Sequence, residues 1–250
     1  MRPEARIISL EADVEELNAR FADAEPQAVL AYAIERFGSK IAAVSSFGAE
    51  SVALLDMVAE INQAQTVLFL DTEMLFPATI AYQQTVAETL GLSDVRVLKA
   101  DRNKVFLADP NGTLNQSDPD LCCSIRKTEP LEEALGGFEA WITGRKRFQS
   151  NGRAALEFFE IDTKGRIKVN PLAHWSAEQV RDYIAARKLP KHPMVAEGFP
   201  SIGCAPCTKA VKPGEDARAG RWAGKDKTEC GIHMINGRFV RRPVEGGKHA

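Results

Sequence analysis

The 250-residue sequence lacks any apolar run that approaches the roughly eighteen consecutive residues of a membrane-spanning helix. Its first residues, MRPEARIISLEADVEEL, are charged throughout and contain no apolar core like that of a secretory signal peptide. It also lacks internal repeats and low-complexity tracts. We therefore expect a cytoplasmic protein with no membrane partner, in a compartment that keeps thiols reduced.

The chain has little net charge, −2 in total, but this charge is unevenly distributed. Residues 201–250 hold ten Lys and Arg against five Asp and Glu, a local charge of +5, so the first 200 residues carry −7. A basic tail on an acidic body either faces an anion or is a solvated C-terminal segment. Because nucleic-acid binding calls for a broadly basic surface, no nucleic-acid partner is expected.

The spacing of apolar residues predicts an α/β fold in which helices alternate with short buried strands. Strands are expected over residues 41–45, 66–70, 95–99 and 140–143, with a hairpin of residues 156–161 and 166–169 around Thr163-Lys164-Gly165. Helices are expected over residues 10–22 with Ser9 as N-cap, 26–37, 77–90 and 177–187, and around 52–59. The predicted architecture is a parallel-sheet core with helices on both faces and an irregular, mobile C-terminal segment. We divide it into a helical segment (1–40), a nucleotide-binding core (41–200) and a basic lid (201–250).

A small, hydroxyl-rich loop follows the first predicted strand and contains Ser45, Ser46, Gly48 and Ser51. Such a loop before a helix lets backbone N–H groups approach an anion. It is neither a Walker A loop nor a GxGxxG loop, because it has no Gly-Lys-Ser/Thr and too few glycines. An ordinary strand-to-helix turn would look the same, so this loop alone does not decide between the two.

Two further polar segments lie at the same predicted sheet edge. Asp71 and Thr72 end the second strand, where open α/β sheets hold ligands, although they could simply cap the next helix. After the fourth strand, Gly144 is followed by the three cations Arg145, Lys146 and Arg147. Three cations at a crevice favour a phosphate or sulfate ligand, while a solvated basic loop is the alternative.

The sequence has only five cysteines, and four of them form two close pairs, Cys122-Cys123 and Cys204-x-x-Cys207. Disulfides are not expected, because the compartment is reducing and adjacent cysteines bridge poorly. Two pairs suggest one tetrathiolate site, which zinc or an iron–sulfur cluster could occupy. Adjacent ligands favour the cluster modestly, because each thiolate can bind a different iron. Two unrelated buried pairs remain the alternative.

The fifth cysteine, Cys230, lies inside the basic tail in Glu229-Cys230-Gly231-Ile232-His233. Nearby cations and a histidine lower a thiol pKa and favour the reactive thiolate. Cys230 is therefore a candidate nucleophile, and a spare surface thiol is the alternative reading.

Taken together, these segments resemble one known family, the adenylylsulfate reductases, which form the iron–sulfur branch of the sulfonucleotide reductases. The resemblance spans nearly the whole chain. Its motifs are SSFGAES (45–51), LDT (70–72), CCSIRK (122–127), GRKRFQS (144–150), GCAPC (203–207) and ECGIH (229–233), in that order. It implies a core similar to the PP-loop adenine-nucleotide fold.

The resemblance also implies roles for individual residues. Cys122, Cys123, Cys204 and Cys207 match the ligands of one [4Fe–4S] cluster per chain, and Cys230 matches the catalytic cysteine of a mobile C-terminal segment. The implied substrate-binding set is Ser45, Ser46, Phe47, Gly48, Ser51, Leu70, Asp71, Thr72, Lys127, Gly144, Arg145, Arg218, Arg221 and His233. Of these, Lys127 matches a lysine between cluster and substrate.

The activity implied by the resemblance is reduction of adenosine 5′-phosphosulfate to sulfite and AMP through an S-sulfocysteine on Cys230, in sulfate assimilation and cysteine biosynthesis. The implied reductant is external, thioredoxin or glutaredoxin, and we expect a homo-oligomer. Relatives that use the 3′-phosphorylated substrate generally lack both cysteine pairs. Two alternatives stand beside this reading: a PP-loop ATP pyrophosphatase that thiolates tRNA, whose Ser-Gly-Gly-x-Asp-Ser loop differs from residues 45–51, and a non-catalytic redox-sensing module.

Overall fold

The computed structural model describes residues 3–222, with side chains from residue 10 onward. Six strands form one sheet in the order β3-β2-β1-β4-β6-β5. All neighbouring strands are parallel except β5 and β6, which form the antiparallel hairpin predicted around Gly165. The strands are β1 (Ile41–Ser45), β2 (Val67–Leu70), β3 (Val95–Leu98), β4 (Ala140–Thr143), β5 (Phe159–Ile161) and β6 (Ile167–Val169).

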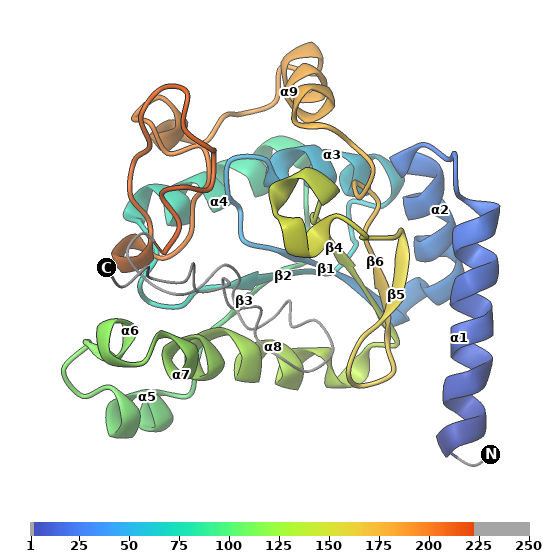
Figure 1. Cartoon of the computed structure of the whole chain (residues 1–250), viewed down its shortest axis with the longest axis horizontal. Coiled ribbons are helices and arrows are strands. Elements are labelled where there is room, and N and C mark those ends of the chain that lie inside the picture. Colours follow the sequence, from blue (N-terminus) through green and yellow to red (C-terminus); the bar gives the residue numbers. More distant parts are fainter. Residues whose placement is uncertain (1–2, 223–250) are drawn as a thin grey trace, which may run out of the picture.

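Helices cover both faces of this sheet, as the sequence predicts (Figure 1). In Figure 1, α3 and α4 lie above the sheet, α8 lies below it, and α1 and α2 stand at the β5 side. The α-helices are α1 (Pro3–Arg20), α2 (Pro26–Phe37), α3 (Ser51–Ile61), α4 (Pro77–Leu90), α5 (Arg102–Ala108), α6 (Leu114–Ser117), α7 (Pro119–Cys123), α8 (Glu129–Ala134) and α9 (Ala177–Ala186). Shorter turns are η1 (Gly38–Lys40), the π-helical η2 (Ser124–Thr128), η3 (Leu135–Gly137), η4 (Arg147–Gln149), η5 (Asn151–Arg153), η6 (Pro193–Val195) and η7 (Ala205–Cys207).

Alternation along the central strands builds a separate core on each face. Val67 and Phe69 of β2 join the larger core with α2, α3, α4 and α9, whereas Leu68 and Leu70 point to the other face. There they pack with Leu131 of α8 in the smaller core. Because both faces of these strands are buried, they appear in the sequence as continuous apolar runs.

The element boundaries correct the sequence-based predictions in several places, including the first strand of the hairpin, which begins at Phe159 and not at residue 156. Ser9 is not a helix N-cap, because α1 already begins at Pro3 and residue 9 lies inside it. The four helices α5 to α8 were not predicted, because each of them has only four to seven residues. Such short helices lack the repeated apolar spacing by which a helix is recognised.

The strand order reverses between β1 and β4, the two central strands, since β2 and β3 continue to one side and β6 and β5 to the other. In open α/β sheets, ligands bind in the crevice beyond the carboxyl ends of the strands at this reversal. The irregular segment that follows α9 reaches the same edge, because Cys204 forms an isolated β-bridge with Leu75, after β2. None of the described helices is both long and apolar enough to cross a bilayer.

The start of α4 is tied to the irregular segment by a buried histidine, His192, which is 1% exposed. Its Nδ1 accepts a hydrogen bond from the backbone N–H of Met194 (3.3 Å). The proton therefore resides on Nε2, which donates to the Thr79 hydroxyl (3.0 Å). Burial lowers the pKa of His192 from 6.5 to about 4, so the ring is neutral at neutral pH.

This depressed pKa makes the fold acid-sensitive. The unfolded chain binds the proton first as the pH falls. The contribution of His192 to the free energy of unfolding is therefore complete above pH 6.5 and is lost as the pH falls towards about 4. At about pH 5 the expected loss is about 2 kcal/mol. Melting temperatures of the wild type and His192→Gln across this range should converge as the pH falls. His174→Gln is the matched control, with a smaller expected effect because that ring is partly exposed. Parallel curves for wild type and His192→Gln would contradict the assignment.

Candidate functional site

The loop between β1 and α3 is held in shape by its own hydroxyl groups. The Ser45 hydroxyl accepts a hydrogen bond from the N–H of Phe47 (3.1 Å), and the Ser51 hydroxyl accepts one from the N–H of Gly48 (3.0 Å). Phe47 has a φ of 46°, which is uncommon for a residue with a side chain. Its ring is fully buried and meets the ring of Phe69 edge-on. The aromatic side chain thus anchors a turn whose polar groups remain at the sheet edge.

A polar pocket opens at this edge, between the loop after β1, the loop after β4 and the C-terminal segment. Most of the predicted substrate-binding residues are brought together here: Ser45, Ser46, Gly48, Ser51, Leu70, Thr72, Lys127, Gly144, Arg145, Arg218 and Arg221. Phe47 and Asp71 are not among its lining residues. Phe47 belongs to the core, and Asp71 forms an ion pair with Lys99 (3.3 Å). Cys230 and His233 lie outside the described residues.

The loop after β4 adds Lys146 to this pocket, a residue outside the predicted substrate-binding set. Lys146 is 2% exposed, and its ammonium donates to the Glu50 carboxylate (2.9 Å) and the Gly144 carbonyl (3.1 Å). Burial lowers the pKa of Lys146, and the adjacent Glu50 opposes that shift. The lysine was visible in the sequence as one of three consecutive cations, but nothing there indicated its partner.

Arg145 is also buried, and neighbouring strands hold its guanidinium in place. It donates to the Asn170 side-chain oxygen (3.0 Å) and forms an ion pair with Glu160. Thr143 donates its hydroxyl proton to the same Asn170 oxygen (2.7 Å). These hydrogen bonds and the ion pair together fix the orientation of the Arg145 guanidinium before any ligand binds.

Four cysteines line a second, smaller cavity. Cys122 and Cys123 end α7, Cys204 directly precedes the single turn η7, and Cys207 is the last residue of that turn. None of the four is in a disulfide, as the sequence predicts. Across residues 3–222, no group of three His, Cys, Asp or Glu side chains is arranged to hold one metal ion. The structure thus has four thiols around one cavity and not a closed mononuclear site.

The thiols differ in their electrostatic surroundings. Burial raises the pKa of Cys122 to about 11. Burial acts in the same direction on Cys204, but Lys127, a hydrogen bond with the Thr72 hydroxyl (3.2 Å) and Arg221 outweigh it and lower the pKa of that thiol. A cationic field therefore reaches into the cysteine cavity from the side of the larger pocket.

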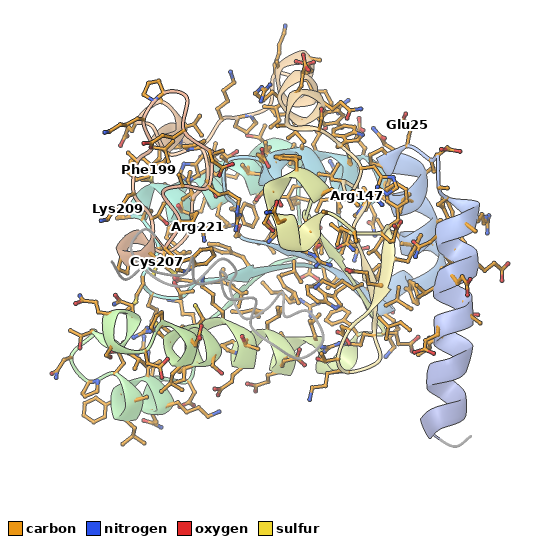
Figure 2. The ribbon with its side chains drawn as sticks, viewed as in Figure 1. Glu25, Arg147, Phe199, Cys207, Lys209 and Arg221 are labelled. Carbon is orange, nitrogen blue, oxygen red and sulfur yellow. The ribbon has the colours of Figure 1, made fainter. Side chains whose placement is uncertain are left out.

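The two cavities share a wall made of Thr72, Lys127, Arg221 and Trp222. The guanidinium of Arg221 donates to the Ile202 carbonyl (3.2 Å) and lies over the ring of Trp222 (4.6 Å). Gly203 leaves the room for it, since a Cβ there would overlap this guanidinium. Figure 2 shows Arg221 close to Cys207, in the C-terminal segment above α7.

Arg126 supports this wall from the buried side. Its side chain is 8% exposed and forms an ion pair with Asp109 (3.0 Å), whose own side chain is 2% exposed. It also donates to the Thr72 carbonyl (3.1 Å). The arginine thus ties the turn that carries Lys127 to the end of β2 and to the loop before α6. This role does not follow from the sequence, because an arginine beside a lysine gives no sign of which one is buried.

Comparisons with known proteins find one matching family and several similar sequences. Residues 40–210 match the phosphoadenosine phosphosulfate reductase domain family. A curated relative from Mesorhizobium japonicum, named adenosine 5′-phosphosulfate reductase, is 51% identical over 80% of this chain and 78% of its own. One from Chelativorans sp. with the same name is 47% identical over 90% and 93%. A phosphoadenosine 5′-phosphosulfate reductase from Gloeobacter violaceus is 41% identical over 88% and 93%.

Solved structures agree on the fold. The crystal structure of a phosphoadenylyl-sulfate reductase from Candida auris, in complex with phosphate, matches with a TM-score of 0.66 and 28% identity, over 79% of this chain and 96% of that one. Yeast FAD synthetase matches with a TM-score of 0.54 and 16% identity, over 82% of this chain and 68% of its own, which concerns the fold alone. The PP-loop type of core predicted from the sequence is confirmed.

Proposed function

The chain belongs to the phosphoadenosine phosphosulfate reductase family, and we propose that it reduces adenosine 5′-phosphosulfate to sulfite and AMP with electrons from an external dithiol protein. Thioredoxin or glutaredoxin is the proposed reductant, and sulfate assimilation leading to cysteine, in the cytoplasm, is the proposed setting. The names of the two most similar relatives described above support the choice of nucleotide.

The observation that carries the proposal is the wall shared by the polar pocket and the cysteine cavity. Lys127 and Arg221 face both spaces, so one pair of cations can act on an anionic substrate and on the contents of the cysteine cavity. A nucleotide-binding protein without sulfur chemistry has no need to join the two spaces. This arrangement also argues against a pure redox-sensing module, which needs the cysteine cavity but not the cationic pocket.

The proposed cofactor is one [4Fe–4S] cluster held by Cys122, Cys123, Cys204 and Cys207. The four side chains suit it, because they line a single cavity and include an adjacent pair that different irons can bind. When bound, the cluster would add a charged, polarisable group next to Lys127. The dithiol supplies both electrons of the reaction, so no redox step is assigned to the cluster.

In the proposed mechanism, the Cys230 thiolate attacks the sulfur of the substrate, and the bond between that sulfur and the phosphate oxygen breaks. AMP leaves with the electron pair of this bond, and Cys230 becomes an S-sulfocysteine. A thiolate of the dithiol protein then attacks the Cys230 sulfur and releases sulfite. Its second thiol resolves the mixed disulfide, so the dithiol is oxidised by two electrons and Cys230 returns as a thiolate. We propose that residues 201–250 act as the lid that brings Cys230 to the pocket.

The cations of the pocket offset the repulsion between a thiolate and the anionic oxygens around sulfur. The proposed groups that line the pocket are Lys127, Arg145, Arg218 and Arg221, and His233 is proposed to act with them. Charge stabilisation of this kind acts in the transition state and is worth most in a site that excludes water. The tRNA-thiolating alternative is disfavoured, because the body of the chain is acidic.

The test of this function is anaerobic purification followed by assays of sulfite release from adenosine 5′-phosphosulfate and from its 3′-phosphorylated form, with thioredoxin. We expect a brown protein with iron and sulfide in equal amounts, and faster turnover of the simpler nucleotide. A colourless, zinc-loaded protein would overturn the cofactor assignment. If neither nucleotide released sulfite, the proposed activity would be overturned.

A further inference from the structure

The polar pocket contains one carboxylate among six cations, counting the described residues that line it. The cations are Lys127, Arg145, Lys146, Arg153, Arg218 and Arg221, and the carboxylate belongs to Glu50. A carboxylate weakens the attraction of such a pocket for an anion. Its presence in a site suited to a phosphate-containing ligand therefore calls for a separate explanation.

Two side chains from the loop after β4 hold Glu50 in place. Lys146 and Gln149 both donate to its Oε2, at 2.9 and 3.1 Å. Glu50 follows β1 and Lys146 follows β4, so this pair spans the crevice at which the strand order reverses. The second oxygen, Oε1, has no hydrogen-bond partner among residues 3–222, and the side chain is 30% exposed. One oxygen of the carboxylate is thus fixed, and the other is open to a donor in the pocket.

The parts of a nucleotide differ in what they can offer this oxygen. The phosphosulfate is anionic and is attracted to Lys127 and Arg221, on the wall shared with the cysteine cavity. The ribose presents two adjacent hydroxyl groups, and both can donate to a carboxylate. In dinucleotide-binding folds an acidic residue at the switch-point crevice binds a ribose hydroxyl in this way, and an arginine serves where that hydroxyl is phosphorylated.

We propose that Glu50 binds the ribose hydroxyls of the substrate and rejects a 3′-phosphate, and is thereby the residue that determines the choice between the two sulfonucleotides. This inference rests on the proposed function for its substrate. Lys146 and Gln149 act as positioning residues, because they fix one carboxylate oxygen and leave the charge facing the sugar. A 3′-phosphate would meet that charge at short range, where like charges repel most strongly.

The experiment measures equilibrium binding of the two products, AMP and adenosine 3′,5′-bisphosphate, to the full-length protein. The wild type should prefer AMP. In Glu50→Gln the preference should fall by about 10-fold or more, because a charge-assisted hydrogen bond is lost together with the repulsion. Binding of 2′,3′-dideoxy-AMP, which has neither ribose hydroxyl, should be nearly equal in the two proteins. The ratio of two ligands on one preparation is insensitive to a loss of folded protein, which covers any destabilisation of buried Lys146.

Glu132→Gln is the matched control. Glu132 is 35% exposed and pairs with the largely buried Arg166, but it does not line the pocket. The Glu132→Gln variant should prefer AMP to adenosine 3′,5′-bisphosphate by the same factor as the wild type. An unchanged preference in Glu50→Gln, or an equal change in Glu132→Gln, overturns the proposal. Failure of the proposed function would look different, since neither sulfonucleotide would release sulfite while the binding ratio still reported on Glu50.

Discussion

Replacing Cys230 by serine is expected to abolish sulfite release from adenosine 5′-phosphosulfate, with a loss of about 10⁴-fold or more in turnover. The reason is chemical. A serine hydroxyl is a far poorer nucleophile than a thiolate at neutral pH. If a serine sulfate ester did form, a dithiol would not cleave its O–S bond. The measurement is steady-state sulfite release with thioredoxin in excess.

The same variant should keep its iron and its affinity for AMP, because the proposed cluster ligands are the four other cysteines and the described pocket is built from residues before 223. A second readout separates the chemical step from turnover. Wild-type protein incubated with substrate and no reductant should gain one SO₃ group, and peptide mapping should place it on Cys230. Retained turnover in Cys230→Ser, or a sulfonated cysteine elsewhere, would refute the assignment.

The central strands were predictable from the sequence because they are buried on both faces. Residues 41–44 and 140–142 are continuous apolar runs, and the strands predicted over 41–45 and 140–143 formed with these bounds. The hairpin around Gly165 and the start of α9 at Ala177 follow from local turn and cap chemistry, which acts within a few residues. The sequence predicted these elements well because their physical causes are local.

The parts of the site that escaped prediction depend on long-range pairing. Glu50 and Lys146 lie 96 residues apart, and Arg126 reaches Thr72 from 54 residues away. Neither pair follows from the periodicity or the spacing of its own segment. The cysteines were an exception, because their residue type and pairing are informative on their own. The cysteine spacing alone could not show that the cysteine cavity and the polar pocket share Lys127, which only the family resemblance implied.

Lys127 is the second residue whose loss should have a large effect. It lies in the π-helical turn directly after Cys122 and Cys123, and it lines both cavities. If its ammonium offsets the repulsion between the Cys230 thiolate and the sulfate oxygens, that contribution is made mainly in the transition state. Lys127→Met should therefore lower kcat by about 10²- to 10³-fold. KM should change much less, because Arg218 and Arg221 remain in the pocket.

Single-turnover measurements sharpen this prediction. Formation of the S-sulfocysteine should slow in Lys127→Met, whereas release of sulfite from preformed intermediate by thioredoxin should keep its rate. Lys104→Met is the control, since Lys104 forms an exposed ion pair with Glu129 and lies outside both cavities. Iron content decides between two roles for the lysine. If iron is lost in parallel with activity, Lys127 is needed to build the cysteine site, and the electrostatic role is refuted. If iron is retained and the first step alone is slow, the cation acts on the substrate.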